Sequence, residues 1–472
     1  MFFDSIKSFF RKKPAKPRAN GGYRHVVRIA LPMVLGNAAF TIMQFTDRVL
    51  LAHYSSEAIQ AALPAGILTF SLLSFFASLA GYAGTFVSQY YGANDLKGCA
   101  KACVGGVAMS FLFLPAFALM IPLCPWLMSL AGHSENLLAA EKEYSFWMIM
   151  TGVPLSLHWV LNGYLVGRNK VIAATVVSTA GCFINIGLDI LFIFGYWGCP
   201  RMGIGGAAFA TFLSQIAGIF LFAAAIVADG ETRALPWREL WRPDWRLMKR
   251  IAKFGLPSGF AMLSDSSSFA VFSLLLGRFD ALSLATSNVV LSINSMAISP
   301  LMGFGNAASV LVGQFQGAHK GNLAMKAGWR CLHLGWLYMV FIGLVFLFFS
   351  EQLLGLFRSP DSAYTVAEMV KLGKLLLFFC VCWGMFDTMN VVLIGGLRGA
   401  GDTRFVFFAL LLVSWVFWVP SELLAVCVFG GTVVTAWLFM LAAIVIFSAV
   451  FFWRWKDGKW KKIDVIGDGR LP

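Results

Sequence analysis

The amino-acid sequence predicts an all-α integral membrane protein with about twelve transmembrane helices in two homologous six-helix bundles. Its composition indicates a membrane protein, because 59% of the 472 residues are hydrophobic and only 13% are charged. Apolar runs of about twenty residues recur from end to end of the chain. The two halves also match each other at a constant offset of 225 residues. Duplicated bundles of this kind face each other across a cavity in many secondary transporters.

The apolar runs are long and continuous, without the alternating segments of about ten residues that are typical of membrane β-strands. We therefore expect helices rather than a β-barrel. The expected spans are 27–52, 60–90, 104–131, 145–167, 171–197, 204–229, 251–277, 283–314, 328–350, 367–396, 405–428 and 431–455.

Lysine and arginine are distributed unevenly between the two sides of the membrane. If the N-terminus is cytosolic, the inner segments hold 30 of the 37 Lys and Arg residues. This asymmetry predicts that both termini are cytoplasmic, in a multi-pass protein of the inner (plasma) membrane. The expected parts are a basic cytosolic segment (1–26), an N-lobe (27–229), a cytosolic connector (230–250), a C-lobe (251–455) and a cytosolic tail (456–472).

The net charge of +14 does not indicate a nucleic-acid partner, because the dense spans leave no soluble face for a basic patch. The nine cysteines lie mostly inside expected spans and lack a metal-ligand pattern. We therefore expect no cofactor and no metal beyond a coupling ion. The expected partners are a small-molecule substrate and membrane lipids, and we expect a monomer.

The connector and the tail both carry tryptophans beside basic residues. In the connector, tryptophan recurs every four residues from 237 to 245, and an arginine follows each one. Tryptophan at headgroup depth beside arginine favours a segment along the inner membrane surface, with Pro243 interrupting any continuous helix. We expect the tail, with Trp453, Trp455 and Trp460 and five nearby lysines and arginines, to lie on the same surface.

The repeated strings are LP at 31–32 and 256–257, and V-x-Q-x-x-G-A at 87–93 and 312–318. The longer string ends a long helix at the cytosolic face in each half, where glycine terminates helices and allows close packing. We interpret these residues as a hinge or gate rather than as substrate contacts. They are Gln89, Gly92, Gln314 and Gly317.

Acidic residues inside the expected spans are the candidates for ion coupling. A charged group within a membrane costs about several kcal/mol unless it faces a wet cavity or a partner. A carboxylate in such a cavity can exchange a proton or coordinate sodium together with nearby oxygen atoms. The candidates are Asp47, Asp189, Asp265, Asp387 and Glu422.

In the first half, Asn185 and Asp189 lie four residues apart, on one face of a helix. We expect them to form one polar cluster with Asp47, which lies in the outer half of the membrane. The hydroxyl of Thr211 could join this cluster or serve only in packing between helices. Arg48 points about 100° away from Asp47, so we expect it to reach headgroups or a cavity wall.

In the second half, Asp265 lies near the middle of its span and Asp387 lies in span ten. At the repeat offset Asp47 corresponds to Phe272, so the two halves share a frame but differ in their acids. Glu422 follows Pro420, which permits a kink. Glu422 is therefore either a polar filler at a hinge or a functional acid.

Five groups of strings stand in a fixed order along the chain: FTDRVLLA, GTFVSQYYGANDLKGCAKA, NIGLDILFIFG with MGIGGAAFATFLS, LPSGFAMLSD, and GMFDTMNVVLIGGLRGAGDT. Together with the internal repeat, they resemble the multidrug and toxic compound extrusion (MATE) family, closest to its NorM-like bacterial branch. The resemblance covers roughly residues 25–455. It implies a twelve-helix antiporter that exports organic, often cationic and lipophilic, compounds in exchange for protons or sodium by alternating access.

The resemblance also implies roles for individual residues. Asp47, Asn185, Asp189 and Thr211 match the ion-coupling cluster of the N-lobe, and Asp265 and Asp387 match the acids of the C-lobe. Three positions depart from the family. Asp265 stands where glutamate is usual, Ser292 where an asparagine implicated in sodium binding is expected, and Trp383 where an aromatic hydroxyl is expected. These departures favour protons over sodium as the coupling ion.

The mechanism that we expect begins when a proton neutralises the cluster around Asp47, so that the first lobe repacks and releases substrate held by Met, Phe and Trp side chains. One alternative is a flippase for lipid-linked oligosaccharides, from a related superfamily. A flippase should line its cavity with several arginines, whereas only Arg48 lies well inside an expected span. A polytopic membrane enzyme would need clustered His, Cys or acid residues at one membrane face, but the histidines are scattered. We therefore expect a transporter and not an enzyme.

Overall fold

The computed structural model describes residues 21–129, 135–357 and 366–467, and all regular structure in these ranges is helical. The N-lobe contains α2 (Tyr23–Tyr54), α3 (Ser56–Gly81), α4 (Ala83–Gly92), α5 (Leu96–Leu112), α6 (Leu114–Ser129), α7 (Glu135–Met150), α8 (Gly152–Gly167), α9 (Val171–Phe194), η1 (Tyr196–Gly198) and α10 (Gly203–Ala228). Two short helices follow, α11 (Gly230–Arg233) and α12 (Trp237–Leu240).

The C-lobe begins with α13 (Trp245–Leu276), α14 (Ala281–Gly317), α15 (Gly321–Phe348), α16 (Ser350–Gly355) and α17 (Val366–Ala400). It continues with α18 (Thr403–Leu412), the π-helix η2 (Val413–Trp418), α19 (Val419–Leu423) and the π-helix η3 (Leu424–Val428). The last elements are α20 (Val433–Asp457) and the 3₁₀-helix η4 (Lys459–Lys462).

Eleven helical segments of the described residues are long and apolar enough to cross a membrane. The one expected span that is not among these eleven, 145–167, is divided at Thr151 into α7 and α8, which have 16 residues each. The Thr151 hydroxyl donates to the Met148 carbonyl (2.5 Å), and Pro154 has no N–H for the carbonyl one turn earlier, so the helix breaks here. With this pair, the predicted all-α membrane fold of two six-helix lobes is confirmed.

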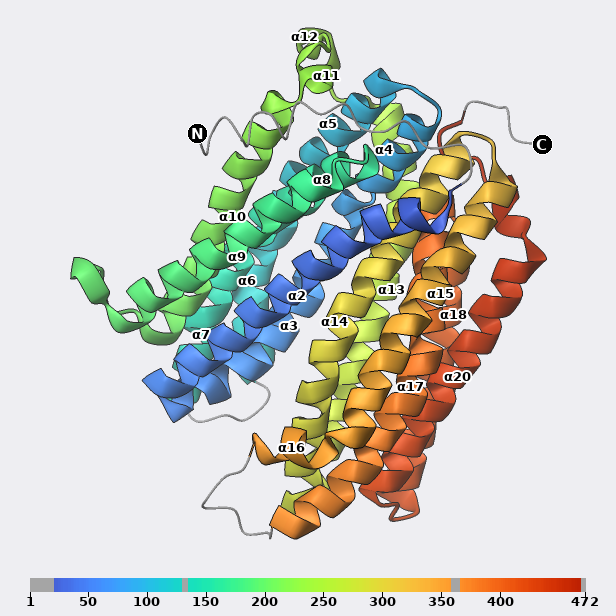
Figure 1. Ribbon diagram of the computed structural model, residues 1–472. Coiled ribbons are helices and arrows are strands. Elements are labelled where there is room, and N and C mark those ends of the chain that lie inside the picture. The colour runs from blue at the N-terminus through green and yellow to red at the C-terminus, as the bar shows by residue number, and fades with distance from the viewer. Residues whose placement is uncertain (1–20, 130–134, 358–365, 468–472) are drawn as a thin grey trace.

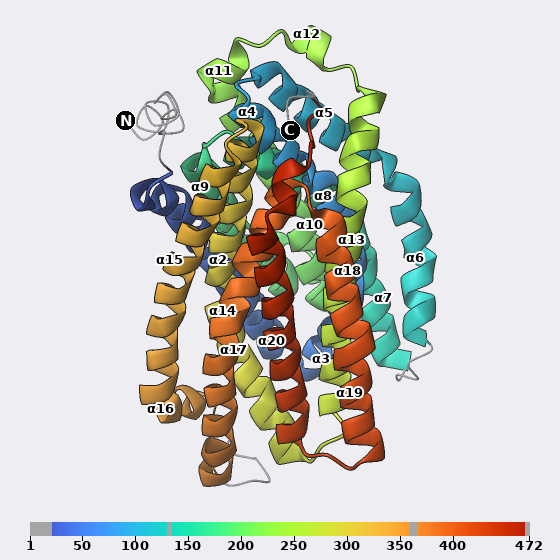
Figure 2. The ribbon, with the colours of Figure 1, turned by 90° about the vertical axis from the view of Figure 1, so that its right-hand side faces the viewer.

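The two lobes pack through helices that the repeat makes equivalent. α2 packs against α14, and α3 packs against α13. At the repeat offset α2 corresponds to α13, and α3 with α4 corresponds to α14. We call the end where α2 begins and α20 ends the terminal end. The lobes meet there and diverge toward the opposite end (Figure 1), and α11 and α12 also lie at the terminal end (Figure 2).

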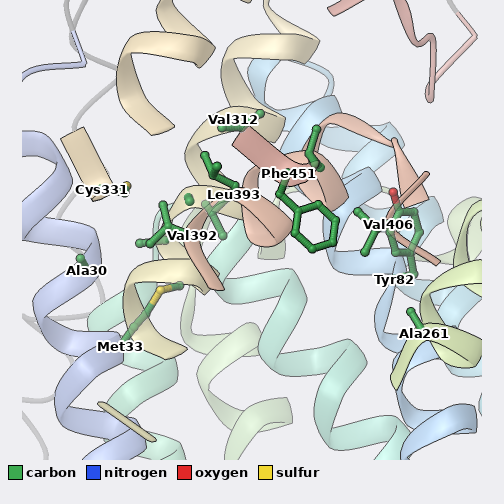
Figure 3. Packing of buried hydrophobic residues seen from close by; sticks show 14 of the residues in the cluster. Ala30, Met33, Tyr82, Ala261, Val312, Cys331, Val392, Leu393, Val406 and Phe451 are labelled. Atoms are coloured by element: carbon green, nitrogen blue, oxygen red, sulfur yellow. The ribbon is translucent and has the colours of Figure 1, made fainter. Parts of the chain in front are cut away.

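A continuous apolar core joins the lobes near the terminal end. Figure 3 shows buried residues of one cluster that come from both halves of the chain: Met33 of α2, Tyr82 between α3 and α4, Ala261 of α13, Val312 of α14 and Leu393 of α17. Because lipid is as apolar as these side chains, the junction in a membrane is held by close van der Waals packing. Hydrogen bonds add to it, including Ser299 Oγ to the Asn37 carbonyl (3.2 Å).

The connector is interrupted around Pro243, as the sequence predicts, and α13 then begins at Trp245. Trp241 and Trp245 are both exposed, whereas the Trp237 indole N–H donates to the carbonyl of Thr232 (2.8 Å). α13 thus starts six residues before the expected span 251–277, because Asp244 caps it by accepting from the backbone N–H groups of Arg246 and Leu247.

The prediction that the tail tryptophans lie on the membrane surface is wrong for Trp455 and Trp460. Both are fully buried and their rings stack at 4.4 Å, with the Trp460 indole N–H donating to the Trp455 carbonyl (3.0 Å). Beyond Trp460, the tail carbonyls of Val465 (2.5 Å) and Ile466 (2.8 Å) accept hydrogen bonds from Arg250 of α13. The tail therefore folds back onto the C-lobe, because its indole and backbone groups find partners there.

A buried ion cluster joins the end of α8 to α11. Arg168 is fully buried and lies 2.9 Å from Asp229 and 3.1 Å from Glu231, while Lys170 lies 2.9 Å from Asp229. Burial alone would raise the pKa of Asp229. The hydrogen bonds from Lys170 and Thr232 and the charge of Arg168 outweigh it and lower this pKa below its ordinary value of 3.8.

We expect Asp229→Asn to destabilise the protein by about 3 kcal/mol at neutral pH, because it removes the carboxylate that Arg168 and Lys170 share and leaves buried Arg168 with Glu231 alone. Since the folded-state pKa is lowered, the wild-type contribution is present above the ordinary value and is lost as pH falls through the folded value. Thermal unfolding of purified protein in detergent, from neutral to strongly acidic pH, measures both effects. Glu351→Gln, in an exposed pair with Lys374, is the control and should leave the unfolding temperature nearly unchanged. Equal losses in the two variants would contradict this prediction.

Candidate functional site

The acids of the N-lobe form a pair. Asp47 of α2 and Asp189 of α9 lie within hydrogen-bonding reach of each other through their carboxyl groups. Asp189 is fully buried, and among the described residues neither of its carboxyl oxygens accepts a hydrogen bond from an N–H or O–H donor. Two adjacent carboxylates without a cation between them cannot both be ionised at low cost. The pair is therefore suited to hold one shared proton.

The other N-lobe candidates differ in their contacts. Asn185 is buried one turn before Asp189, and its amide N and O have no hydrogen-bond partner within the described residues. The Thr211 hydroxyl donates to the Ala207 carbonyl of its own helix (3.0 Å), so the structure gives it no bond to the acid pair. Arg48 is exposed and interacts electrostatically with Asp47, although no ion pair is described between them.

Tyr144 of α7 was not predicted from the sequence. It interacts electrostatically with both Asp47 and Asp189. The expected span began one residue later, at 145, so Tyr144 was counted outside the membrane. Its signal in the sequence is weak, because it follows the charged run Glu141 to Glu143, which favours a loop.

The acids of the C-lobe lie on two helices. Asp265 lies near the middle of α13 and is solvent-accessible, and Asp387 of α17 is half-buried. The two interact electrostatically, and Asp387 is hydrogen-bonded to the side chain of Asn390. Asn390 in turn donates to the Ile444 carbonyl of α20 (3.2 Å) and accepts from the Ser448 hydroxyl (3.0 Å). Asp387 is thus held by a network between α17 and α20.

Arg398, which the sequence predicts to lie in an inner loop, adds a cation to the acids of the C-lobe. α17 continues to Ala400, past the expected end at 396, so Arg398 lies in the last turn of this helix rather than in a loop. The helix can continue because Gly395 and Gly399 pack directly against the backbone of α14. The Arg398 side chain interacts electrostatically with Asp265, and its buried Nε has no hydrogen-bond partner among the described residues.

The remaining three candidates have other partners. The Ser292 hydroxyl donates to the Asn288 carbonyl of its own helix (2.7 Å). Trp383 packs against Trp437, with ring centroids 6.4 Å apart. Glu422 is fully buried and accepts a hydrogen bond from the Trp418 indole (2.6 Å). No described hydrogen bond or ion pair joins any of the three to Asp265 or Asp387.

The four repeated residues meet between the lobes, where α4 crosses α14. Gln89 Nε2 donates to the Gly399 carbonyl (2.9 Å), and Gln314 Nε2 donates to the Gly167 carbonyl (2.9 Å). Gly92 lies against the Gln314 carbonyl and Gly317 against the Gln89 carbonyl, so closely that neither position has room for a Cβ atom. The two contacts are equivalent under the repeat, so the lobes meet here almost symmetrically. We call this contact the glycine crossing.

The chain matches known proteins along most of its length. The MatE family model matches residues 32–191 and 257–424, which is more than half of the chain. The "Probable multidrug resistance protein NorM" of Pseudomonas putida is 27% identical over 449 residues, covering 91% of this chain and 94% of that protein. The protein of the same name from Thermotoga maritima is 25% identical over 458 residues, covering 95% of each chain.

Solved structures share the fold. A transporter of the MOP superfamily from Pyrococcus furiosus, described as having a binding pocket of reverse polarity, superposes with a TM-score of 0.84 at 18% identity and covers 97% of this chain and 99% of its own. A multidrug resistance MATE family transporter in an outward-facing conformation superposes with a TM-score of 0.82 at 19% identity. It covers 96% of this chain and 98% of its own. At these identities the likeness establishes the fold alone.

Proposed function

This chain belongs to the MatE family of secondary transporters, and from this premise we propose that it is a multidrug efflux antiporter that exchanges protons for organic, lipophilic cations. The observation that carries the proposal is the acid pair Asp47–Asp189, which lies across α2 and α9. A group that alternates between one proton and none is what proton antiport requires. The relatives that bear the name multidrug resistance protein support drug-like substrates.

In this proposal the terminal end faces the cytosol of the inner (plasma) membrane. Basic residues support that orientation, because they gather between α11 and the first turns of α13 and in the tail. The lobes meet at the terminal end and diverge at the opposite end (Figure 1), which in this orientation supports assigning the conformation to an outward-facing state. Both lobes lie in one chain, and we propose that the transporter works as a monomer with lipid as its solvent.

The transport cycle begins with a proton entering the Asp47–Asp189 pair from outside. The added proton removes the repulsion between the carboxylates, so α2 and α9 can repack. Asn185, buried beside Asp189 with an unbonded amide, can then hydrogen-bond the neutral pair. This repacking weakens substrate binding between the lobes, and the glycine crossing then opens toward the cytosol.

The C-lobe acids act on the substrate in this proposal. Asp265 is solvent-accessible and interacts with Asp387, so together they attract a cation from the space between the lobes. Sodium coupling at this place has less support, because the Ser292 hydroxyl is engaged within its own helix. Protons are therefore the proposed coupling ion, with no cofactor.

We expect export of tetraphenylphosphonium from vesicles containing the purified protein to follow an imposed pH gradient and to ignore an imposed sodium gradient. A selective electrode that follows movement of the probe across the vesicle membrane, under each gradient in turn, measures this. Protein-free vesicles are the control. Export driven by sodium alone would overturn proton coupling, and no export under either gradient would overturn the cationic substrate class.

A second candidate function has one observation in its favour. Arg398 is half-buried and interacts electrostatically with Asp265, and a lipid-linked oligosaccharide flippase would use such cations to bind pyrophosphate. Translocation of a fluorescent polyprenyl pyrophosphate between leaflets, lost in Arg398→Gln, would favour the flippase over the antiporter.

A further inference from the structure

Glu422 is a buried acid that the proposed cycle does not use. It lies in α19 of the C-lobe and has no solvent-exposed surface. Its Oε1 accepts from the Trp418 indole (2.6 Å), whereas its Oε2 is buried without a hydrogen-bond partner among the described residues. Within the described part of the chain, this carboxyl group has one neutral donor and no ion pair.

The Trp418 indole that donates to Glu422 belongs to an aromatic cluster. The ring centroid of Phe272 in α13 lies 6.2 Å from that of Trp418 in η2 and also 6.2 Å from that of Trp437 in α20. α13, α20, η2 and η3 are the elements packed most closely against α19. Their titratable and charged residues are Arg246, Lys249, Arg250, Lys253 and Asp265 of α13, Cys427 of η3, and Arg454, Lys456 and Asp457 of α20.

None of these residues has a described ion pair or hydrogen bond with Glu422. Arg278, just beyond α13, donates to the Cys427 thiol (3.2 Å) instead. A single neutral hydrogen bond does not offset the lost hydration of a full charge in an apolar site. The structure is therefore consistent with a neutral Glu422 that carries a proton.

The helix around Glu422 has two π-helical segments. Pro420 has no N–H to donate to the carbonyl one turn earlier, and η2 precedes it while η3 follows. Bonds of the π type occur on both sides, from the Val419 N–H to the Ser414 carbonyl and from the Phe429 N–H to the Leu424 carbonyl (3.1 Å). Such wide turns are rare in proteins, and those that occur are often found at functional sites and at helix kinks.

η2 connects Glu422 to the acid of α13. The Trp418 indole, at the end of η2, donates to Glu422, and the Trp415 indole, near its start, donates to the Ser264 hydroxyl (3.1 Å). Ser264 directly precedes Asp265. A change at Glu422 that moves η2 would therefore disturb the residue next to Asp265.

We propose that Glu422 is a second proton-binding site, which lies inside the C-lobe and acts on Asp265 through η2. Loss of its proton places a charge in the aromatic site, η2 rearranges, and the bond between Trp415 and Ser264 breaks. The inference deepens the proposed antiport, on which its role in the transport cycle rests. Binding of the proton and its coupling to Asp265 can be tested without transport.

The first test is infrared difference spectroscopy of the purified protein in lipid nanodiscs near neutral pH. The spectrum of wild type minus Glu422→Gln should contain the carbonyl stretch of a protonated carboxyl group. Trp418→Phe should shift that band, because it removes the hydrogen-bond donor. The matched control is Glu351→Gln, which removes an exposed acid paired with Lys374 and should yield only bands of an ionised carboxylate. The same ionised bands for Glu422 would overturn the proposal.

The second test measures the coupling. The titration of Asp265 is isolated as the difference between each protein and its Asp265→Asn counterpart. Glu422→Gln and Trp415→Phe should both change the proton affinity of Asp265, by about fivefold or more if the coupling is of ordinary size. Unchanged affinity in both variants would mean that Glu422 is a structural residue. Neither test involves export, so failure of tetraphenylphosphonium transport would refute the proposed function without affecting this result.

Discussion

Asp47→Asn is expected to reduce proton-driven export of tetraphenylphosphonium to the level of protein-free vesicles while the protein remains folded. An asparagine amide has nearly the same shape as the carboxyl group but cannot take up and release a proton. Asp189, fully buried beside it, would lose the partner with which it shares that proton. Export under an imposed pH gradient and thermal unfolding of the same sample measure the two parts of this prediction.

Two further variants make the test specific to the acid pair. Asp189→Asn should have the same effect, and the double variant should be no worse than either single variant, because the two carboxyl groups act as one site. Glu351→Gln replaces an exposed acid outside the site and should export normally. Full activity in Asp47→Asn would remove Asp47 from the mechanism.

Gly92→Ala is expected to open the glycine crossing and to lower export strongly. The added Cβ would overlap the Gln314 carbonyl, which belongs to the helix backbone and cannot turn aside. Overpacking of this kind costs about 1–3 kcal/mol, and every 1.4 kcal/mol lowers the population of the closed arrangement about tenfold. Hydrogen exchange of the backbone amides in residues 86–95 and 311–320, together with export, measures the change.

The internal repeat supplies a built-in replicate of this experiment. Gly317→Ala should act in the same way, because Gly317 meets the Gln89 carbonyl as Gly92 meets that of Gln314. The matched control is Gly181→Ala in α9, where an added Cβ meets no atom within 4 Å. Alanine there should be neutral or slightly stabilising, since it favours a helix more than glycine does. Normal exchange and export in both crossing variants would contradict a gate at this contact.

Helix boundaries account for most differences between the sequence prediction and the structure. Tyr144 and Arg398 each lie within a few residues of an expected span end, and both were therefore assigned to loops. Hydropathy averages over about twenty residues, so it places a span well and its last turn poorly. α7 and α8 show the same limitation, because a local break at Thr151 does not change the average.

The sequence by itself determined the membrane class, the order of the helices, the two-lobe repeat and the acids available for coupling. These properties follow from composition, from the length of apolar runs and from identity at a fixed offset, and each is local or periodic along the chain.

Only the tertiary structure decided which of these residues meet. The sequence already predicted a cluster of Asp47 with Asp189, but it left the role of Thr211 open, and the structure bonds the Thr211 hydroxyl within its own helix. The structure also brought Gly92 against the Gln314 carbonyl and buried Trp460 beneath the C-lobe. Such contacts depend on the rotation and crossing point of each helix, which side-chain packing between distant segments sets and no single segment encodes.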